Sequence, residues 1–404
     1  MERADVIILG GGLVGLALAA ALDSSGLTAI IVDPADPSPR TDAAFDGRTS
    51  AVSSSSMKML ETIGVGALLP EAGCPIWRIA VADGLEPGGL HFDPNDGEPL
   101  GFMNENRNLR AALHARAEAA EHVTLCWNAR VVGTDRADHG VEVKLADGRV
   151  LRAPLLVAAD GRNSAMREDA GITLARWKYD HQAIVSVIGH QKPHDHVAYE
   201  IFYPSGPFAL LPMTDGASGP RSAIVWSVPN EDAAGWLALN DEDFAAEAEA
   251  TMGGCLGKVA MLAPRSSFPL GFHHAARITD KRLALVGDSA HAIHPIAGQG
   301  LNLGFRDVAA LAQVLVEGAR LGLDLGDAQL LARYQRWRSL DALSVAVATD
   351  SLTRIYGVPG KAASAVRRLG MGLVGRITPL RNRLMSEARG TSGELPLLLR
   401  GLPI

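Results

Sequence analysis

Short apolar runs alternate with helical patterns at the start of the chain. Residues 5–9 form an apolar run of the length expected for a strand buried on both faces of a sheet. Apolar residues at helical spacing follow from Leu16 to Leu22, and Gly26 ends the pattern. A second apolar run covers Ala29–Val32. Strand, helix and strand in this order predict a parallel sheet covered by helices, which is an α/β fold.

Two further buried strands are predicted much later, at residues 155–159 and 283–286. Because the strands of one sheet then come from separated parts of the chain, we expect a domain assembled from discontinuous segments. Asp147-Gly148 adds a hairpin turn between apolar runs. The segments expected to form this domain are 1–75, 101–175 and 276–340.

A different pattern fills residues 176–275. Runs rich in β-branched and aromatic residues predict strands, and a helical stretch at 242–252 follows them. We interpret residues 76–100 and 176–275 as an inserted β-sheet/α domain that binds the substrate, with a loop at 87–99. Residues 341–404 are expected to form a C-terminal helical segment. The predicted strands of the insert are 183–188, 197–203, 208–211 and 223–228.

The turn after the first strand carries a Gly-x-Gly-x-x-Gly fingerprint, typical of a Rossmann-like dinucleotide site. Gly10 permits the tight turn, Gly12 lets a pyrophosphate approach the backbone, and Gly15 lets the helix pack closely on the strand. Asp33 ends the second strand, where a carboxylate can bind a ribose. The candidate residues of this site are Gly10, Gly12, Leu13, Val14, Gly15 and Asp33.

Two acidic turns, Asp160-Gly161 and Gly287-Asp288, follow the two later strands. The carboxyl ends of parallel strands meet at one edge, where doubly wound sheets bind ligands. The Asp288 carboxylate can accept hydrogen bonds there from a polyol such as the ribityl chain of FAD. A glycine-rich helix start follows, and its unpaired N–H groups and dipole suit an anion. Its candidate residues are Gly298, Gly300, Leu301 and Asn302.

These three motifs together resemble those of the FAD-dependent aromatic monooxygenases related to para-hydroxybenzoate hydroxylase. The Gly-Gln-Gly-Leu-Asn-Leu-Gly sequence at 298–304 is most similar to the ubiquinone-biosynthesis hydroxylases. The resemblance covers almost the full length of the chain. It implies bound FAD, NAD(P)H as a transient reductant, and a C(4a)-hydroperoxyflavin that hydroxylates a polyprenylated phenol. It also implies that the loop with Pro295 and Gly298 forms the wall at the reactive flavin face.

Other functions stay open at this point. The same motifs suit a flavin-dependent hydroxylase of another aromatic compound, an isoprenoid reductase or epoxidase, and a non-catalytic FAD-bound scaffold of a biosynthetic complex. A hydrolase or a nucleotide triphosphatase has no support, because the chain has neither a Gly-x-Ser-x-Gly elbow nor a phosphate loop.

Two arginines are candidates for the pyrophosphate side of FAD. The resemblance places Arg48 there, since related enzymes have an Arg after the second strand, and a guanidinium offers phosphate a bidentate fork. A surface salt bridge is the alternative for Arg48. At the start of the helix at 106–113, the resemblance points to Arg107, with Asn106 as the competing residue.

Composition and charge narrow the possible classes of protein further. The 404 residues contain no run of 18 apolar positions and no signal-peptide pattern, so we expect a cytoplasmic protein. The net charge of −7 argues against nucleic-acid binding. His194-x-His196 and His291-x-x-His294 invite a metal interpretation. We expect no metal, because no third ligand stands near either pair at the spacing of a zinc site.

The tail is both basic and apolar. A basic amphipathic segment can lie on an anionic membrane surface or dock on a partner, and the alternative is a helix packed on the flavin domain. The partner hypotheses are therefore peripheral contact with the inner face of the membrane, a ubiquinone-biosynthesis protein complex, and a homodimer. Against the single acid Glu387, the basic residues are Arg354, Lys361, Arg367, Arg368, Arg376, Arg381, Arg383 and Arg389.

Overall fold

A six-stranded sheet forms the centre of the computed structural model, which describes residues 2–37, 45, 47–85, 89–94, 96–293, 298–339, 367 and 377–404. The strand order is β20-β21-β13-β2-β3-β9, and within this sheet only β20 is antiparallel to its neighbour. Every residue of β2, β3, β13 and β21 is buried, which confirms the strands predicted from the apolar runs. The strands are β2 (Val6–Leu9), β3 (Ala29–Val32), β9 (Val123–Cys126), β13 (Leu155–Ala158), β20 (Thr279–Asp280) and β21 (Leu283–Leu285).

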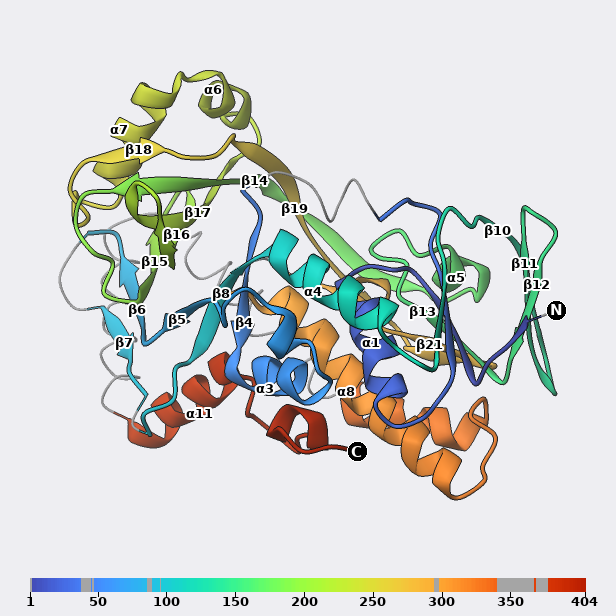
Figure 1. Cartoon of the computed structure of the whole chain (residues 1–404). Helices are drawn as coiled ribbons and strands as arrows, with labels where there is room; N and C mark the ends of the chain where they lie inside the picture. The colour runs from blue at the N-terminus through green and yellow to red at the C-terminus, as the bar shows by residue number, and fades with distance from the viewer. Residues whose placement is uncertain are drawn as a thin grey trace.

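Helices pack beside this sheet (Figure 1). Helix α1 (Leu13–Asp23) contacts both α4 (Asn106–Glu118) and α8 (Gln299–Arg320). Every residue of α1 from Gly15 to Leu22 is buried, because the helix lies between these neighbours and the sheet. Gly26 has a φ of +77° and turns the chain back toward β3, as its place in the sequence predicted.

A four-stranded sheet lies at the amino-terminal end of the molecule (Figure 1). The predicted hairpin is confirmed, with β11 and β12 antiparallel and Gly148 at a φ of +88° in the turn. The amino-terminal strand β1 pairs with β12 in parallel. The strands are β1 (Glu2–Arg3), β10 (Val131–Ala137), β11 (Gly140–Leu145) and β12 (Val150–Ala153).

The insert forms a nine-stranded sheet, ordered β22-β19-β14-β17-β16-β15-β6-β7 with β18 beside β14. The predicted strands and helix of the insert are confirmed, although β14, β16 and β17 are longer than the apolar runs. The long strands β14 and β19 run from the lobe with α6 and α7 toward the parallel sheet (Figure 1). The elements are β6 (Arg78–Asp83), β7 (Leu90–Phe92), β14 (Leu174–His190), β15 (Val197–Tyr203), β16 (Gly206–Gly216), β17 (Gly219–Pro229), α6 (Ala233–Ala238), α7 (Asp241–Thr251), β18 (Val259–Met261), β19 (Ser266–Ala275) and β22 (His291–Ala292).

The loop expected at residues 87–99 is wrong in one respect, because β7 forms within it. Leu90 and Phe92 point inward at 8% and 9% exposure while His91 points out, and β7 pairs with β6 at the edge of the nine-stranded sheet. Three residues are too few to show a strand period in the sequence. Strands β6 and β7 thus share a sheet with the strands from β14 to β19, and the domain boundaries themselves stay a prediction.

A small sheet in the order β4-β8-β5 lies between the two large ones. Its strand β4 contacts α8, and its strands β5 and β8 contact β16 of the nine-stranded sheet. Helix α3 follows β4 directly, and the side chain of Ser53 caps it by accepting a hydrogen bond from the backbone of Ser56. The elements are β4 (Thr49–Ser53), α3 (Ser54–Thr62), η1 (Gly66–Leu68), β5 (Cys74–Ile76) and β8 (Gly101–Glu105).

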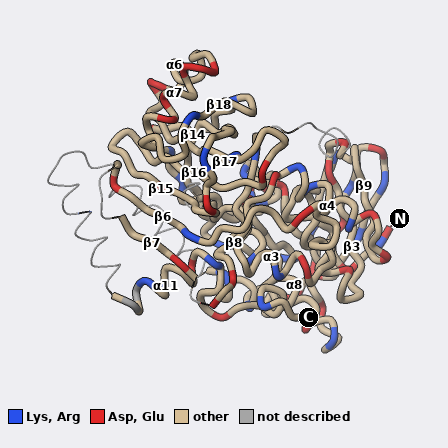
Figure 2. The backbone as a smooth tube through the Cα atoms, turned by 60° about the vertical axis from the view of Figure 1, so that its left-hand side comes forward, with Lys and Arg blue, Asp and Glu red and all other residues tan. Residues whose placement is uncertain are grey.

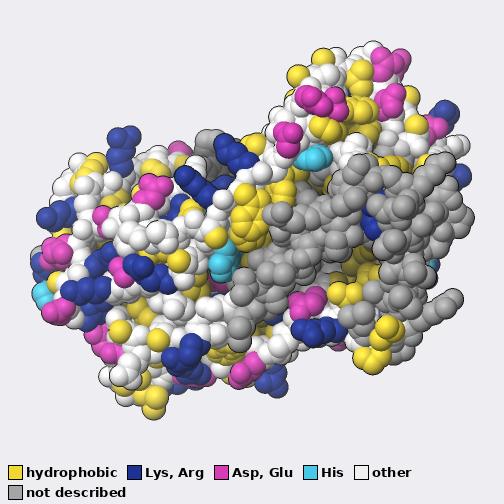
Figure 3. Space-filling model, turned by 180° about the vertical axis from the view of Figure 1, so that it is seen from behind, with side chains coloured by type: hydrophobic (Ala, Val, Ile, Leu, Met, Phe, Trp, Pro, Cys, Tyr) yellow, Lys and Arg dark blue, Asp and Glu magenta, His cyan; other side chains and the backbone are white. Residues whose placement is uncertain are grey.

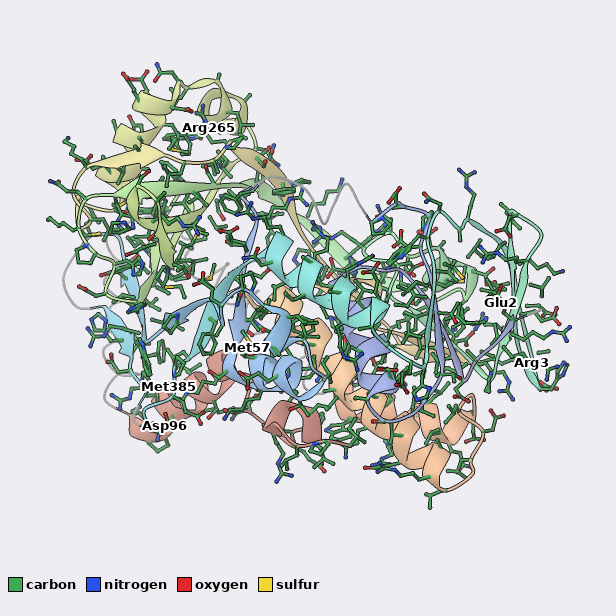
Figure 4. The ribbon with its side chains drawn as sticks, in the orientation of Figure 1. Glu2, Arg3, Met57, Asp96, Arg265 and Met385 are labelled. Atoms are coloured by element: carbon green, nitrogen blue, oxygen red, sulfur yellow. The ribbon has the colours of Figure 1, made fainter. Side chains whose placement is uncertain are left out.

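The described end of the chain consists of helix α11 (Thr378–Arg389) and the 3-10 turn η4 (Leu397–Arg400). Arg389 pairs with Asp96, so α11 is joined to the segment after β7 (Figure 4). Met385 packs on an apolar cluster that includes Phe202. The structure shows helical turns in the described part of the segment predicted at 341–404, namely α11 and η4. Residues 341–366 and 368–376 lie outside the described residues.

Charges of both signs are spread over the surface. Acidic side chains gather at α6 and α7, whereas Lys and Arg alternate with Asp and Glu over much of the rest of the molecule (Figures 2 and 3). No helix among the described residues is long and apolar enough to cross a membrane.

Candidate functional site

The glycine turn between β2 and α1 has the geometry predicted for it. Gly10 has a φ of +110°, and a Cβ there would lie 2.3 Å from the carbonyl oxygen of Ala159. A Cβ on Gly15 would lie 2.0 Å from the carbonyl oxygen of Gly10. By contrast, a Cβ on Gly12 would meet nothing within 4 Å. Gly10 and Gly15 are therefore required by the packing, whereas Gly12 faces open space at the start of α1, where a ligand can approach the backbone.

The carboxylate of Asp33 closes one side of this turn. Its Oδ2 accepts a hydrogen bond from the backbone of Gly11 at 2.7 Å, and its Oδ1 accepts one from Ala35 at 2.8 Å. Trp127 covers Gly11 and stacks on His114, with ring centroids 5.4 Å apart. Sequence reasoning missed this aromatic wall, because Trp127 and His114 come from separate elements. The hollow here is lined by Gly11, Gly12, Leu16, Asp33, Ala35, Asp36, Pro37, Arg110, His114 and Trp127.

The second predicted turn follows β13 at the same edge of the sheet. Asp160 uses Oδ2 to accept a 3.4 Å hydrogen bond from the backbone of Met166, at the start of α5 (Ala165–Asp169). Its Oδ1 is buried and has no hydrogen-bond partner among the described residues. Gly161 has a φ of +79° and open space where a Cβ would stand. A buried, unsatisfied carboxylate oxygen at this edge is the kind of acceptor that a polar ligand would satisfy.

The third turn, η2 (Gly287–Ser289), follows β21. The side chain of Asp288 reaches solvent, but protein packed around its carboxyl group partly desolvates it. This desolvation disfavours the charged form and raises the pKa of Asp288, although the charges of Arg162 and His291 act to lower it. The backbone of this turn is held firmly. His273 donates from Nε2 to the Asp288 carbonyl oxygen at 2.8 Å, and burial lowers the pKa of His273 to about 4.

Helix α8 begins at the remaining glycine-rich motif. Gly298 adopts a left-handed conformation with a φ of +62°, and a Cβ on Gly300 would meet open space. Asn302 is buried, and its side chain accepts from the Ser53 backbone at 2.8 Å and donates to the Ala51 carbonyl at 2.8 Å. The Asn302 side chain therefore joins α8 to β4. The predicted loop residue Pro295 lies outside the described residues.

The predicted residues Leu13, Val14 and Leu301 lie at the starts of α1 and α8, partly buried against the core. A Cβ on Gly304 would lie 2.8 Å from a methyl group of Val14, and one on Gly287 would lie 3.2 Å from it. The Val14 side chain thus sits between Gly287 and Gly304. This contact requires small residues at both positions and brings the first and third motifs together.

A buried charge cluster beneath the third turn was not predicted from the sequence. Asp307 on α8 accepts from the backbone of Gly287 at 2.9 Å and from Nε of Arg338 at 2.6 Å, and its Oδ2 lies 2.8 Å from Nε2 of His291. Burial alone would raise the pKa of Asp307, but the charges of His291 and Arg338 lower it overall. The acid thus holds the turn before Asp288. In the sequence, Asp307 stands next to Arg306 in a helix that carries other charged residues, so no local pattern marks it as buried.

The two candidate arginines have partners within the protein. The guanidinium of Arg48 lies 4.9 Å from the ring centroid of Phe268 in β19. Arg107 donates from Nε to Glu105 at 2.6 Å, and Glu105 also pairs with Arg221 at 2.8 Å. Asn106 accepts a hydrogen bond from Ser50 at 2.7 Å. The structure therefore places Arg107 in a charge cluster beside the small sheet, and a direct contact of either arginine with FAD stays a prediction.

The three turns together fit an FAD molecule. They lie at the carboxyl ends of β2, β13 and β21, which are neighbours in the sheet. Open space at Gly12, Gly161 and Gly300 leaves room for backbone contact with a ligand. Acceptors at this edge suit hydroxyl groups, and the uncapped N-termini of α1 and α8 suit a pyrophosphate and an anionic ring edge.

The comparisons with known proteins agree with this geometry. A family model described as an FAD binding domain matches residues 3–348. The ubiquinone hydroxylase UbiL of Rhodospirillum rubrum is 44% identical over 405 residues, covering 99% of this chain and 94% of that protein. The 3-demethoxyubiquinol 3-hydroxylase of Escherichia coli is 33% identical, covering 96% of this chain and 99% of that protein. The COQ6 ubiquinone biosynthesis monooxygenase of Xenopus tropicalis is 32% identical, covering 95% of this chain and 93% of that protein.

Among solved structures, p-nitrophenol 4-monooxygenase PnpA from Pseudomonas putida superposes with a TM-score of 0.78 at 18% identity, covering 98% of this chain and all of that one. At this identity the match shows the fold alone. Fold and site define a flavoprotein of the aromatic-hydroxylase class, with FAD as its cofactor and NAD(P)H as the usual reductant of that class. The chain belongs to the ubiquinone-biosynthesis hydroxylase family of FAD-dependent aromatic monooxygenases.

Proposed function

We propose that this enzyme hydroxylates the ring of a polyprenylated phenol in ubiquinone biosynthesis. The observation that carries the proposal is the 44% identity to the ubiquinone hydroxylase UbiL across almost both full lengths. The site residues support it, because all three flavin motifs are present at one edge of the sheet.

An apolar core cluster beside the third motif supports a lipid-like substrate. A Cβ on Gly298 would lie 3.1 Å from Cβ of Ala51 in β4. Ala51 packs against an apolar cluster that extends to Phe202 and Met213 of the nine-stranded sheet and to Met385 of α11. This continuity from the start of α8 to the second sheet supports the proposal that the phenol ring lies between them.

Bound FAD would accept reducing equivalents from NAD(P)H and activate O2 for transfer to the ring. The protein would bind and orient the reactants. In this proposal Gly12 and the α1 N-terminus hold the pyrophosphate, Asp33 a ribose, and Asp160 and Asp288 further polar groups of the cofactor. The α8 N-terminus, held to β4 by Asn302, would stabilise negative charge on the reduced ring system.

Deletion of the gene tests the pathway. In a strain without a redundant hydroxylase, quinone analysis by mass spectrometry should show loss of ubiquinone and accumulation of a prenylated intermediate that lacks one ring oxygen. Wild-type enzyme should restore ubiquinone. Normal ubiquinone in the deletion strain would contradict the pathway assignment.

We further propose that α11 contributes to reversible contact with an anionic membrane or a partner. Leu384 on this helix and Ile377 just before it are 37% and 48% exposed, and Arg383 on the helix is also exposed. Each basic residue near an anionic surface adds about 1 kcal/mol of attraction. Arg367 is excluded from this role, because it is buried and pairs with Asp83 at 3.1 Å.

Liposome sedimentation tests the contact. Anionic vesicles should retain the wild type at low salt and retain less of the double variant Arg381→Gln/Arg383→Gln. The matched control, Arg149→Gln/Lys281→Gln, removes two exposed cations far from α11 and should bind like the wild type. Equal binding by all three proteins would defeat the role given to α11. A homodimer stays a separate prediction, which gel filtration with light scattering would test.

A further inference from the structure

Three potential metal ligands converge beside the nine-stranded sheet, away from the three flavin turns. Cys74 opens β5, whereas His194 and His196 lie in the turn before β15. One ligand atom from each residue lies within 4.8 Å of the other two. Sγ of Cys74 is 3.4 Å from Nδ1 of His196. No third ligand stands near His194 and His196 in the sequence. The fold supplies one, Cys74, from 120 residues before His194.

The spacing is close to what a tetrahedral ion requires. Zinc binds thiolate sulfur at about 2.3 Å and imidazole nitrogen at about 2.0–2.1 Å, so the sulfur and nitrogen of a tetrahedral site lie roughly 3.5 Å apart. The observed separation of Cys74 Sγ and His196 Nδ1 matches this value. The third ligand atom, from His194, lies within 4.8 Å of the other two and would move inward to bind the ion.

The hydrogen bonds of His194 fix the tautomer that a ligand through Nδ1 requires. Its Nε2 lies 2.9 Å from the carbonyl oxygen of Met213, so Nε2 carries the proton and donates it. Metal-binding histidines are usually held in this way by a second hydrogen bond. Nδ1 therefore keeps its lone pair, which now accepts a 3.1 Å hydrogen bond from the His196 backbone. A metal ion at Nδ1 of His194 would replace the hydrogen bond from the His196 backbone N–H.

The backbone of the turn is unusual. Asp195 and His196 have φ angles of +50° and +58°, the left-handed region that non-glycine residues rarely adopt. Two successive residues in this region indicate a conformation that the surrounding contacts enforce. One such contact is the hydrogen bond from the Trp77 backbone to the His196 carbonyl at 3.0 Å, which joins the turn to the end of β5.

Charged groups of both signs lie around the cluster. Burial raises the pKa of the Cys74 thiol to about 12, Asp215 and Glu71 add to this shift and Arg221 opposes it, so an ion must displace the thiol proton to bind. His190 lies near His194, with ring centroids 5.8 Å apart. Both nitrogens of His190 are already bonded, to Lys192 and to Ser222, so it is not available as a ligand.

The geometry points to a binding site for one divalent transition-metal ion of the zinc type, formed by Cys74, His194 and His196. The thiol proton of Cys74 leaves to solvent when the ion binds, and a water molecule completes the tetrahedron. The ion would join the small sheet to the nine-stranded sheet. Since β5 pairs with β8 and β8 pairs with β4, the site is two strands from Ala51, which lies beside Gly298.

Metal uptake by the FAD-loaded enzyme without a purification tag tests this site. After treatment with a chelator, the protein is mixed with Zn²⁺, desalted and analysed for zinc per chain. The wild type should retain one equivalent. Cys74→Ala and His196→Gln should bind zinc at least about 100-fold more weakly, because each lacks a direct ligand. Cys255→Ser, at an exposed cysteine outside the cluster, should bind like the wild type.

Co²⁺ identifies the ligands independently. A thiolate-to-cobalt charge-transfer band should appear in the wild type and be absent from Cys74→Ala, measured as a difference spectrum so that the flavin bands cancel. Unchanged FAD content in both variants shows that they are folded. Absence of zinc uptake by the wild type, or equal uptake by all four proteins, would overturn the site and leave Cys74 and His196 as a simple hydrogen-bonded pair.

Discussion

Oδ2 of Asp307 lies 2.8 Å from Nε2 of His291, and these two side chains are 0% and 2% exposed. The same carboxyl group contacts the backbone of Gly287 and the guanidinium of Arg338. One buried acid on α8 therefore fixes the turn that presents Asp288. This links the core of the helix to the proposed cofactor site, although Asp307 itself is not at the surface of that site.

Asp307→Asn should destabilise the protein by about 3–5 kcal/mol, because it leaves the guanidinium of Arg338 buried without its counter-charge. Urea unfolding of the FAD-free protein measures this loss. The control is Asp138→Asn, whose side chain is 96% exposed and whose loss should cost no more than about 0.5 kcal/mol. Equal stability of the two variants would show that the cluster does not hold the turn.

Asp288→Ala should weaken FAD binding by about 1.5–3 kcal/mol, since it removes a charged hydrogen-bond acceptor at the proposed site. Titration of the FAD-free protein with FAD gives the dissociation constant directly. Asp147→Ala, in the exposed hairpin turn, is the matched control and should bind FAD normally. An unchanged dissociation constant in Asp288→Ala would remove this residue from the site.

The two glycines Gly12 and Gly15 should respond differently to the same substitution. Gly12→Ala adds a methyl group to open space, so the protein should fold normally but bind FAD poorly. Gly15→Ala places its Cβ 2.0 Å from the Gly10 carbonyl, so the fold itself should be destabilised. Circular dichroism and thermal unfolding of the FAD-free proteins separate the two effects. Normal FAD binding by Gly12→Ala would contradict the proposed approach of the pyrophosphate.

Glu200 should make stability depend on pH. On β15 it shares a face with the apolar residues Ala198 and Phe202, and burial raises its pKa from 4.5 to about 8. The folded protein thus keeps a proton that the unfolded chain loses, so stability should fall as pH rises from about 4.5 to about 8 and then level off.

Glu200→Gln should remove this contribution and flatten the slope of unfolding free energy against pH within that window. Glu118→Gln, at a side chain that is 60% exposed, should keep the slope of the wild type. Denaturant unfolding at several pH values measures both. A wild-type slope in Glu200→Gln would show that another group is responsible.

The parts of the fold that the sequence predicted are local. The strand, glycine turn and helix from Val6 to Asp23 lie next to each other in the chain, and each element has its own period or turn residue. The acidic turns at Asp160 and Asp288 were predictable for the same reason, because each follows a recognisable buried strand.

The parts that were not predicted depend on long-range pairing. Trp127 covers Gly11, and Cys74 meets His196, although more than 100 residues separate each pair. No local pattern carries such contacts. The short edge strand β7 was missed because three residues show no period, and the pairing with β6 stabilises it.

We propose that this chain uses FAD to place one oxygen atom from O2 on a prenylated phenol. A single experiment supplies the FAD-loaded enzyme with NAD(P)H, isotopically heavy O2 and a short-chain prenylated phenol, and follows the product by mass spectrometry. We expect NAD(P)H oxidation stimulated by the phenol and a ring product that carries one heavy oxygen atom. A product whose added oxygen comes from water, or a flavin that is reduced and reoxidised with no hydroxylated phenol from any prenylated substrate, would contradict it.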